Sequence, residues 1–170
     1  TSKISREDDL YALTTLGFRG EALASIAAVS NVELITKTKD SKIGTRIIVE
    51  GGECSGIFDT ACEEGTTIII TNLFFNTPVR KKFLKPDNTE TALIIDFASK
   101  MALAYPDIKI RFINNETILF ATSGKGNIYQ NILTVYSKQT AEHLIEVHSG
   151  NESEDFALNG YISRPDQSNA

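Results

Sequence analysis

The chain has 170 residues, a formal net charge of −5 and an apolar share of 41%. This composition is typical of a globular protein with one core, or with one domain and part of another. No apolar run approaches the roughly 20 residues of a membrane span, and the polar first residues do not resemble a signal sequence, so we expect a cytoplasmic protein. The net charge argues against a general polyanion-binding protein. However, residues 76–125 carry eight Lys or Arg against five Asp or Glu, so a local nucleic-acid contact stays open.

The first predicted helix follows two closely spaced glycines in the stretch GFRGEAL at 17–23. Leu23, Ile26 and Ala27 recur at helical intervals, which predicts a helix from about Gly20 to Val29. Two glycines before a first turn let a bound group approach the backbone, and the free N–H groups of a helix start favour an anion. From these residues alone, a plain turn with a glycine near the helix start is the favoured interpretation, and phosphate binding is the alternative.

Three strands are predicted next. Residues 31–38 and 44–50 alternate in polarity or are rich in β-branched side chains, which indicates an antiparallel hairpin. The run TTIIITNLFF at 66–75 is continuously apolar at its centre, a pattern typical of a strand buried on both faces. Cys54 and Cys62 lie in what reads as a loop-rich acidic stretch, and they lack the neighbours that a zinc site or a disulfide framework would need.

The next predicted helix covers residues 89–104, and its apolar stripe of Leu93, Phe97 and Met101 indicates a core-facing side. Asn114-Asn115, between two β-rich runs, predicts a second hairpin.

Ser123 to Gly126 is the best candidate for a linker. A short helix and two strands are expected beyond it, at 128–136, 144–147 and 156–163. We therefore predict one domain over 1–123 and the beginning of a second over 124–170. His143 and His148 fall on opposite faces of the predicted strand region, so no metal pair is expected.

The order of these elements predicts an α/β fold, a two-layer sandwich of helices on a mostly antiparallel sheet. A doubly wound parallel fold would carry its phosphate loop directly after a strand, as GxxxxGK[ST] or GxGxxG, and neither pattern occurs. An anion held by the glycine stretch would therefore use a different kind of loop.

Four segments together resemble the N-terminal ATPase region of the MutL family of DNA mismatch repair proteins: TSKI at 1–4, GFRGEALASIAAVS at 17–30, GTTI at 65–68 and LFFNTPVRKKFL at 73–84. The resemblance covers essentially the whole chain. It implies an incomplete Bergerat-type ATPase fold, shared with gyrase-type topoisomerases, a heat-shock chaperone family and histidine kinases. The start of a ribosomal-protein-like α/β transducer domain would follow.

The resemblance also implies an activity and partners. ATP binding and hydrolysis, with Mg²⁺, would drive homodimerisation and switch contacts with DNA, a mismatch-recognition protein and a downstream nuclease or helicase. Thr1, Ser2 and Lys3 correspond to the flexible lid over the nucleotide, and Thr66 corresponds to the threonine near the adenine. The phosphate-cradling motif corresponds to Gly17, Phe18, Arg19, Gly20, Glu21, Ala22 and Leu23. Backbone N–H groups suit triphosphate oxygens, and a threonine hydroxyl suits a water-linked contact with a base edge.

Several of these residues also have structural interpretations. In these interpretations Lys3 would be a solvated side chain at a chain end, Arg19 would cap a neighbouring helix, and Thr66 would reflect strand propensity. Glu21 favours the dipole of a helix start with or without a ligand.

The family's catalytic motifs are missing from these 170 residues. In the family, the glutamate that activates water, the asparagine that holds Mg²⁺ and the DxGxG aspartate that reads adenine all precede the lid. A lysine that reaches the terminal phosphate lies in the following domain. We therefore expect no catalytic residue and no metal ligand here, and no ATP hydrolysis by residues 1–170 alone.

Two other functions stay open. A non-catalytic module could bind DNA through Arg80, Lys81, Lys82 and Lys85, although such a run is more often a solvated surface than a DNA contact. A topoisomerase or chaperone ATPase is the weaker alternative, because those relatives carry a different glycine motif and do not account for FNTPVRKKFL.

Overall fold

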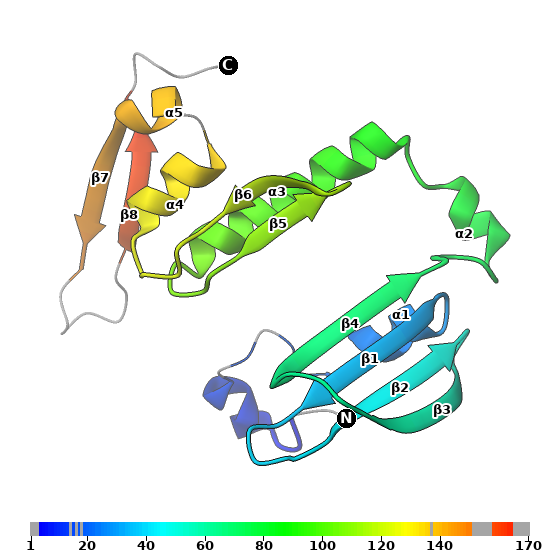
Figure 1. The fold of residues 1–170 in the computed structure, drawn as a ribbon. Helices are drawn as coiled ribbons and strands as arrows, with labels where there is room; N and C mark the ends of the chain where they lie inside the picture. Colours follow the sequence, from blue (N-terminus) through cyan, green and yellow to red (C-terminus); the bar gives the residue numbers. More distant parts are fainter. Residues whose placement is uncertain are drawn as a thin grey trace. The chain divides into compact units, whose positions relative to one another are not determined.

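The computed structural model describes residues 4–13, 15, 17, 19–136, 138–150 and 158–164. Contacts between residues divide the chain into two units, Thr1–Leu84 and Lys85–Ala170. Figure 1 gives the elements of each unit in sequence colours. The predicted boundary between a domain over 1–123 and a second domain over 124–170 stays a prediction.

The first unit is built on a four-stranded antiparallel sheet with the strand order β3-β2-β1-β4. The strands are β1 (Asn31–Lys37), β2 (Gly44–Glu50), β3 (Glu53–Thr60) and β4 (Gly65–Thr71). The β1–β2 hairpin confirms the prediction from residues 31–38 and 44–50. The structure forms β3 in the stretch that the sequence pattern assigned to loops, so that assignment was wrong. Gly51 and Gly52 join β2 to β3 with φ of 57° and 94°, and such a pair of left-handed residues makes a tight hairpin turn.

Strand β4 occurs where the sequence predicts a strand, but its predicted burial on both faces was wrong. Ile68, Ile69 and Ile70 are 46%, 43% and 44% exposed. Successive strand residues point to opposite faces, so both faces of β4 are open in the described structure. β4 is also an edge strand, paired only with β1 among the described residues. It ends at Thr71 because Asn72 and Phe74 turn the chain with φ of 53° and 62°.

Three short helices complete the described part of the first unit: the 3-10 helix η1 (Glu7–Ala12), α1 (Ala22–Ala27) and α2 (Pro78–Lys82). Helix α1 confirms the helix predicted after the glycine pair, although it is shorter than residues 20–29. It packs against β1 and buries Ala27, while Val32 of β1 is also buried. The core of this unit therefore lies between α1 and the sheet.

The second unit combines three helices with two antiparallel hairpins. Its elements are α3 (Asp87–Ala104), β5 (Arg111–Asn114), β6 (Thr117–Ala121), α4 (Ile128–Val135), α5 (Lys138–Glu142), β7 (Leu144–Ser149) and β8 (Leu158–Ser163). The β5–β6 hairpin confirms the prediction, with its turn at Asn115 and Glu116 at φ of 45° and 67°. All the described sheets are antiparallel, which confirms the predicted α/β class with helices on an antiparallel sheet.

Helix α3 packs through a different face from the predicted one. Leu93 and Phe97 are 50% and 65% exposed, whereas Ser99 and Ala102 are buried. The buried side faces α4, where the side-chain Nδ2 of Asn131 donates to the carbonyl of Ala102 over 2.8 Å. The core of the second unit is formed by Ala102, Phe120, Ile132 and Ala141. Leu93 and Phe97 of the predicted core stripe are therefore exposed, and Met101, its third residue, is only half-buried.

Candidate functional site

The glycine motif connects η1 to α1. Gly20 has a φ of 71°, a conformation that glycine adopts at little cost, and α1 begins two residues later at Ala22. Glu21 occupies the N-cap position but makes no side-chain cap hydrogen bond. The described residues of the motif, from Gly17 through Arg19 to Leu23, are exposed. The geometry gives an accessible backbone before a short helix, as the sequence predicts.

Four of the predicted nucleotide-binding residues lie outside the described residues: Thr1, Ser2, Lys3 and Phe18.

Thr66 lies near the start of β4, directly opposite Thr36 of β1. Its hydroxyl is 2.9 Å from the Thr36 hydroxyl, and the Thr36 hydroxyl also donates to the carbonyl of Gly65 over 3.2 Å. Both threonines can therefore orient their hydroxyls without a ligand.

The segment after β4 holds the other end of α1. The backbone N–H of Phe74 donates to the carbonyl of Val29 over 2.7 Å, and Asn76 Nδ2 donates to the carbonyl of Ala28 over 2.9 Å. These bonds satisfy carbonyls that a helix end leaves without partners. Sequence reasoning missed this role for Asn76, because no local pattern reports a contact between residues 48 positions apart.

The basic run forms helix α2, which the sequence analysis did not predict. Arg80, Lys81 and Lys82 lie in this helix and Lys85 follows it, all exposed. No ion pair is recorded for any of the four in the described part of the chain. Phe83, next to them, is 81% exposed. The run therefore offers positive charge to solvent beside an aromatic side chain.

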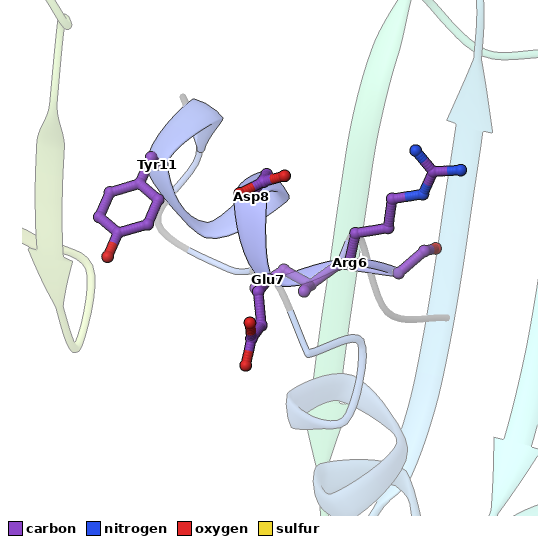
Figure 2. Close-up of a pocket in the computed structure, with 6 residues that line it drawn as sticks. Arg6, Glu7, Asp8 and Tyr11 are labelled. Carbon is purple, nitrogen blue, oxygen red and sulfur yellow. The ribbon is translucent and has the colours of Figure 1, made fainter.

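A hollow of about 740 Å³ lies along η1, lined by Ile4, Ser5, Arg6, Glu7, Asp8 and Tyr11. Figure 2 shows that Arg6 and Tyr11 point in opposite directions, so these side chains do not converge on one point. All the lining residues come from one short stretch of chain. The lining of this hollow therefore does not indicate a binding site.

Metal and membrane features are absent from the described residues. No group of three or more His, Cys, Asp or Glu that could hold a metal ion occurs among them. Cys54 and Cys62 are free thiols. In the part of the chain that was searched, no helix is long and apolar enough to cross a membrane.

Comparison with known proteins identifies the family. No protein-family model matches the chain. However, the DNA mismatch repair proteins MutL of Bacillus anthracis and Bacillus cereus are each 44% identical to it over all 170 residues. The solved Aquifex aeolicus MutL ATPase domain complexed with ADP superimposes with a TM-score of 0.74 at 25% identity, covering 94% of this chain and 60% of that chain. The chain belongs to the MutL family, and it corresponds to the family's ATPase region.

A second solved structure, the N-terminal domain of a DNA repair protein, superimposes on this MutL-family chain with a TM-score of 0.71 at 25% identity. It matches 89% of this chain and 50% of that one. The chain spans 27% of the length of the Bacillus anthracis relative. The sheet, α1 and the glycine motif described above thus belong to an ATPase-domain fold.

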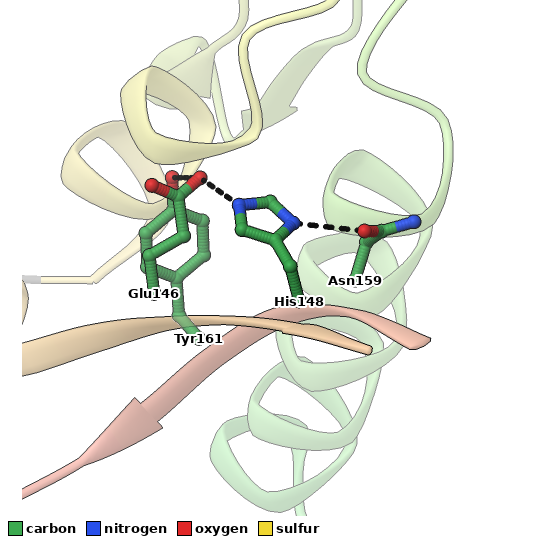
Figure 3. A network of polar contacts seen from close by, with 4 residues as sticks. All are labelled: Glu146, His148, Asn159 and Tyr161. Atoms are coloured by element: carbon green, nitrogen blue, oxygen red, sulfur yellow. Dashed lines mark hydrogen bonds and ion pairs between the residues drawn. The ribbon is translucent and has the colours of Figure 1, made fainter. Parts of the chain in front are cut away.

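A polar network of the second unit lies on one face of the β7–β8 hairpin (Figure 3). His148 Nδ1 is 2.8 Å from Asn159 Oδ1, and His148 Nε2 is 3.2 Å from Glu146 Oε1. The Tyr161 hydroxyl donates to the same Glu146 oxygen over 3.0 Å, and its ring lies against Tyr129 of α4. Only the imidazolium form of His148 can donate at both ring nitrogens.

We expect the pKa of His148 to lie above its ordinary value of 6.5, because the hydrogen bond to Asn159 and the charge of Glu146 favour the protonated ring. Its folded-state pKa is raised, so the hairpin gains this stabilisation fully below pH 6.5 and loses it as the pH rises through the folded-state pKa. NMR titration of the His148 ring should show the raised value, and Asn159→Ala should lower it. An unchanged titration in Asn159→Ala would contradict the assigned hydrogen bond.

Proposed function

We propose that this chain is the nucleotide-binding part of a MutL protein that binds and hydrolyses ATP with Mg²⁺. In this proposal ATP closes the lid, drives homodimerisation, and so switches contacts with DNA, a mismatch-recognition protein and a downstream nuclease or helicase in the cytoplasm. One observation carries the proposal: the structural match to an Aquifex aeolicus MutL ATPase domain complexed with ADP. It is supported by the 44% identity to MutL sequences over the whole chain.

The described residues fit a nucleotide. Gly17 and residues 19–23 are exposed, Gly20 takes the left-handed conformation, and no side-chain cap hydrogen bond forms at the start of α1. N–H groups at such a turn suit phosphate oxygens. In the proposal, the described residues Gly17, Arg19, Gly20, Glu21, Ala22 and Leu23 surround the phosphates together with Phe18. Thr66 binds near the adenine, and Thr1, Ser2 and Lys3 close over the nucleotide.

The described residues do not fit Mg²⁺, because they contain no acidic or histidine cluster for a metal ion. The ion would neutralise phosphate charge, and its ligand would come from another part of the protein.

ATP-dependent dimerisation of the full-length protein tests the proposed switch. Sedimentation should detect dimers with a non-hydrolysable ATP analogue and monomers without nucleotide. A protein that binds the analogue but stays monomeric would contradict the switch and leave nucleotide binding intact.

The second candidate function, a DNA-binding module, is favoured by the exposed positive charges of α2. If Lys81 and Lys82 contact phosphates, Lys81→Glu with Lys82→Glu should weaken DNA binding at low salt. The slope of log affinity against log salt should shrink by about one unit for each lost contact. Fluorescence anisotropy with a labelled duplex at several salt concentrations measures both effects.

Lys42→Glu is a control for the charge change, because Lys42 is an exposed lysine in the loop between β1 and β2. An unchanged salt slope in the α2 variant would mean that α2 is a solvated face.

A further inference from the structure

The hydroxyls of Thr36 and Thr66 lie on the face of the first sheet against which α1 packs. Alternate residues of a strand point to the same face, so Thr36 shares its face with Val32, which is buried in the core beside α1. The pairing of β1 with β4 aligns Val32 with Ile70 and Thr36 with Thr66, so Thr66 points to this face as well. Figure 1 shows β1 and β4 side by side in the sheet, with α1 across β1. The threonine pair therefore lies on the same side of the sheet as the helix that follows the glycine motif.

The two hydrogen bonds of Thr36 decide which hydroxyl donates in the pair. A threonine hydroxyl carries one hydrogen, and its oxygen can also accept. The carbonyl of Gly65 can only accept, so the 3.2 Å bond to it uses the hydrogen of Thr36. The 2.9 Å contact between the two hydroxyls then uses the hydrogen of Thr66, with the Thr36 oxygen as acceptor. Thr36 thus links the Thr66 side chain to the backbone at the start of β4.

This link restricts a side chain that the sheet leaves exposed. Thr66 is exposed and Thr36 is half-buried, so the bond ties an accessible hydroxyl to a partner within the sheet. The Thr66 oxygen keeps a lone pair with which to accept from a ligand or a water. If a ligand instead needs the hydrogen of Thr66, Thr36 can turn its own hydrogen from the Gly65 carbonyl to Thr66. The hydroxyl pair is kept in both cases, and with it the position of the Thr66 oxygen.

We propose that Thr36 is a positioning residue for the contact between Thr66 and the adenine base. The inference rests on the proposed nucleotide site and deepens it, because it adds a residue that acts on the base through Thr66. Thr36 holds the Thr66 hydroxyl in place before the nucleotide arrives. A hydroxyl that is already held loses less rotational freedom on binding than a free one, and this raises the affinity for the ligand that it contacts.

The test measures ADP and GDP binding by the full-length protein with isothermal titration calorimetry. Thr36→Val keeps the β-branched shape that suits a strand but removes the hydroxyl. It should weaken ADP binding about threefold to tenfold, the range expected for one neutral hydrogen bond. GDP binding should change less, because the adenine contact is the one that Thr66 makes, so the preference for ADP should fall. Thr36→Ser keeps the hydroxyl and should keep the wild-type affinity and preference.

Thr38→Val is the matched control. It removes another short contact between hydroxyls, the 2.7 Å contact of Thr38 with Ser41 in the loop after β1. This contact does not involve Thr36 or Thr66, so the control should bind ADP as the wild type does. Thermal unfolding of each variant shows whether it is folded.

A double-mutant cycle with Thr66→Val distinguishes positioning from a structural role. If Thr36 acts through Thr66, Thr36→Val should cause no further loss of ADP affinity in a protein that already carries Thr66→Val. Additive losses overturn the inference, as does an equal fold-loss of ADP and GDP binding in Thr36→Val. Wild-type ADP binding by Thr36→Val, or a loss of affinity in Thr36→Ser as large as in Thr36→Val, overturns it as well. A wild-type protein that binds no ADP would contradict the proposed function itself, and the inference with it.

Discussion

Residues 1–170 alone are expected to hydrolyse no ATP above background, whereas the complete ATPase domain should show slow, magnesium-dependent turnover. Hydrolysis needs a base that orients and deprotonates water, a metal ion that neutralises the phosphates, and donors that stabilise the departing charge. The described residues offer exposed backbone donors before α1, but no cluster for a metal ion. Release of inorganic phosphate from both proteins, with and without Mg²⁺, measures the difference.

Glu21 supplies the control for this prediction, because it is the acidic residue closest in sequence to the phosphate-cradling glycines. It occupies the N-cap of α1, where its charge would repel a triphosphate if it pointed toward the nucleotide. Glu21→Gln in the complete domain should therefore keep the kcat of hydrolysis at saturating ATP, whatever its effect on the KM for ATP. Hydrolysis by residues 1–170, or loss of kcat at saturating ATP in Glu21→Gln, would mean that the catalytic base lies in this chain.

Gly20→Val should abolish nucleotide binding in the complete domain. Gly20 has a φ of 71°, a conformation that costs a residue with a side chain roughly 1–2 kcal/mol, and more for a β-branched one. Valine would also place methyl groups where the backbone must approach phosphate oxygens. Titration with a fluorescent ATP analogue measures the affinity, and thermal unfolding measures the cost to stability.

The matched control is Gly52→Val, in the turn between β2 and β3. Gly52 also has a positive φ, of 94°, and a Cβ there would meet the Ala28 Cα at an ordinary contact distance of 3.5 Å. The control should therefore carry a comparable backbone strain while nucleotide binding is kept. If a folded Gly20→Val protein bound the ATP analogue with wild-type affinity, the glycine motif would not be the phosphate-binding motif.

Local patterns predicted the elements whose signals are local. The alternation in residues 31–38 gave β1, and Asn114-Asn115 gave the β5–β6 hairpin, because turn chemistry and side-chain period act over a few residues. Strand β3 was not predicted because ECSGIFDT is poor in β-branched residues. Its strand conformation depends on hydrogen bonds to β2, which a local pattern does not report. The Gly51-Gly52 pair could have predicted a hairpin turn after β2, and therefore a strand at the position of β3.

Burial and long-range contacts could not be predicted in the same way. Ile68 to Ile70 have a strand pattern, but their exposure depends on which elements cover β4 and not on the strand itself. Pro78 was an available sign of a helix start for α2, since proline is favoured in a first helical turn. The glycine motif could be placed before a helix, whereas the hydrogen bond from Asn76 to Ala28 depends on the tertiary fold.

The edge position of β4 has a consequence for handling the chain in solution. TTIIIT carries no charge and no proline, and charges and prolines are what native edge strands use to block pairing with another molecule. Three consecutive exposed isoleucines on such an edge favour strand addition between copies at high concentration. Thr67→Lys or Thr71→Lys would place a positive charge on this edge and oppose such pairing between copies of residues 1–170.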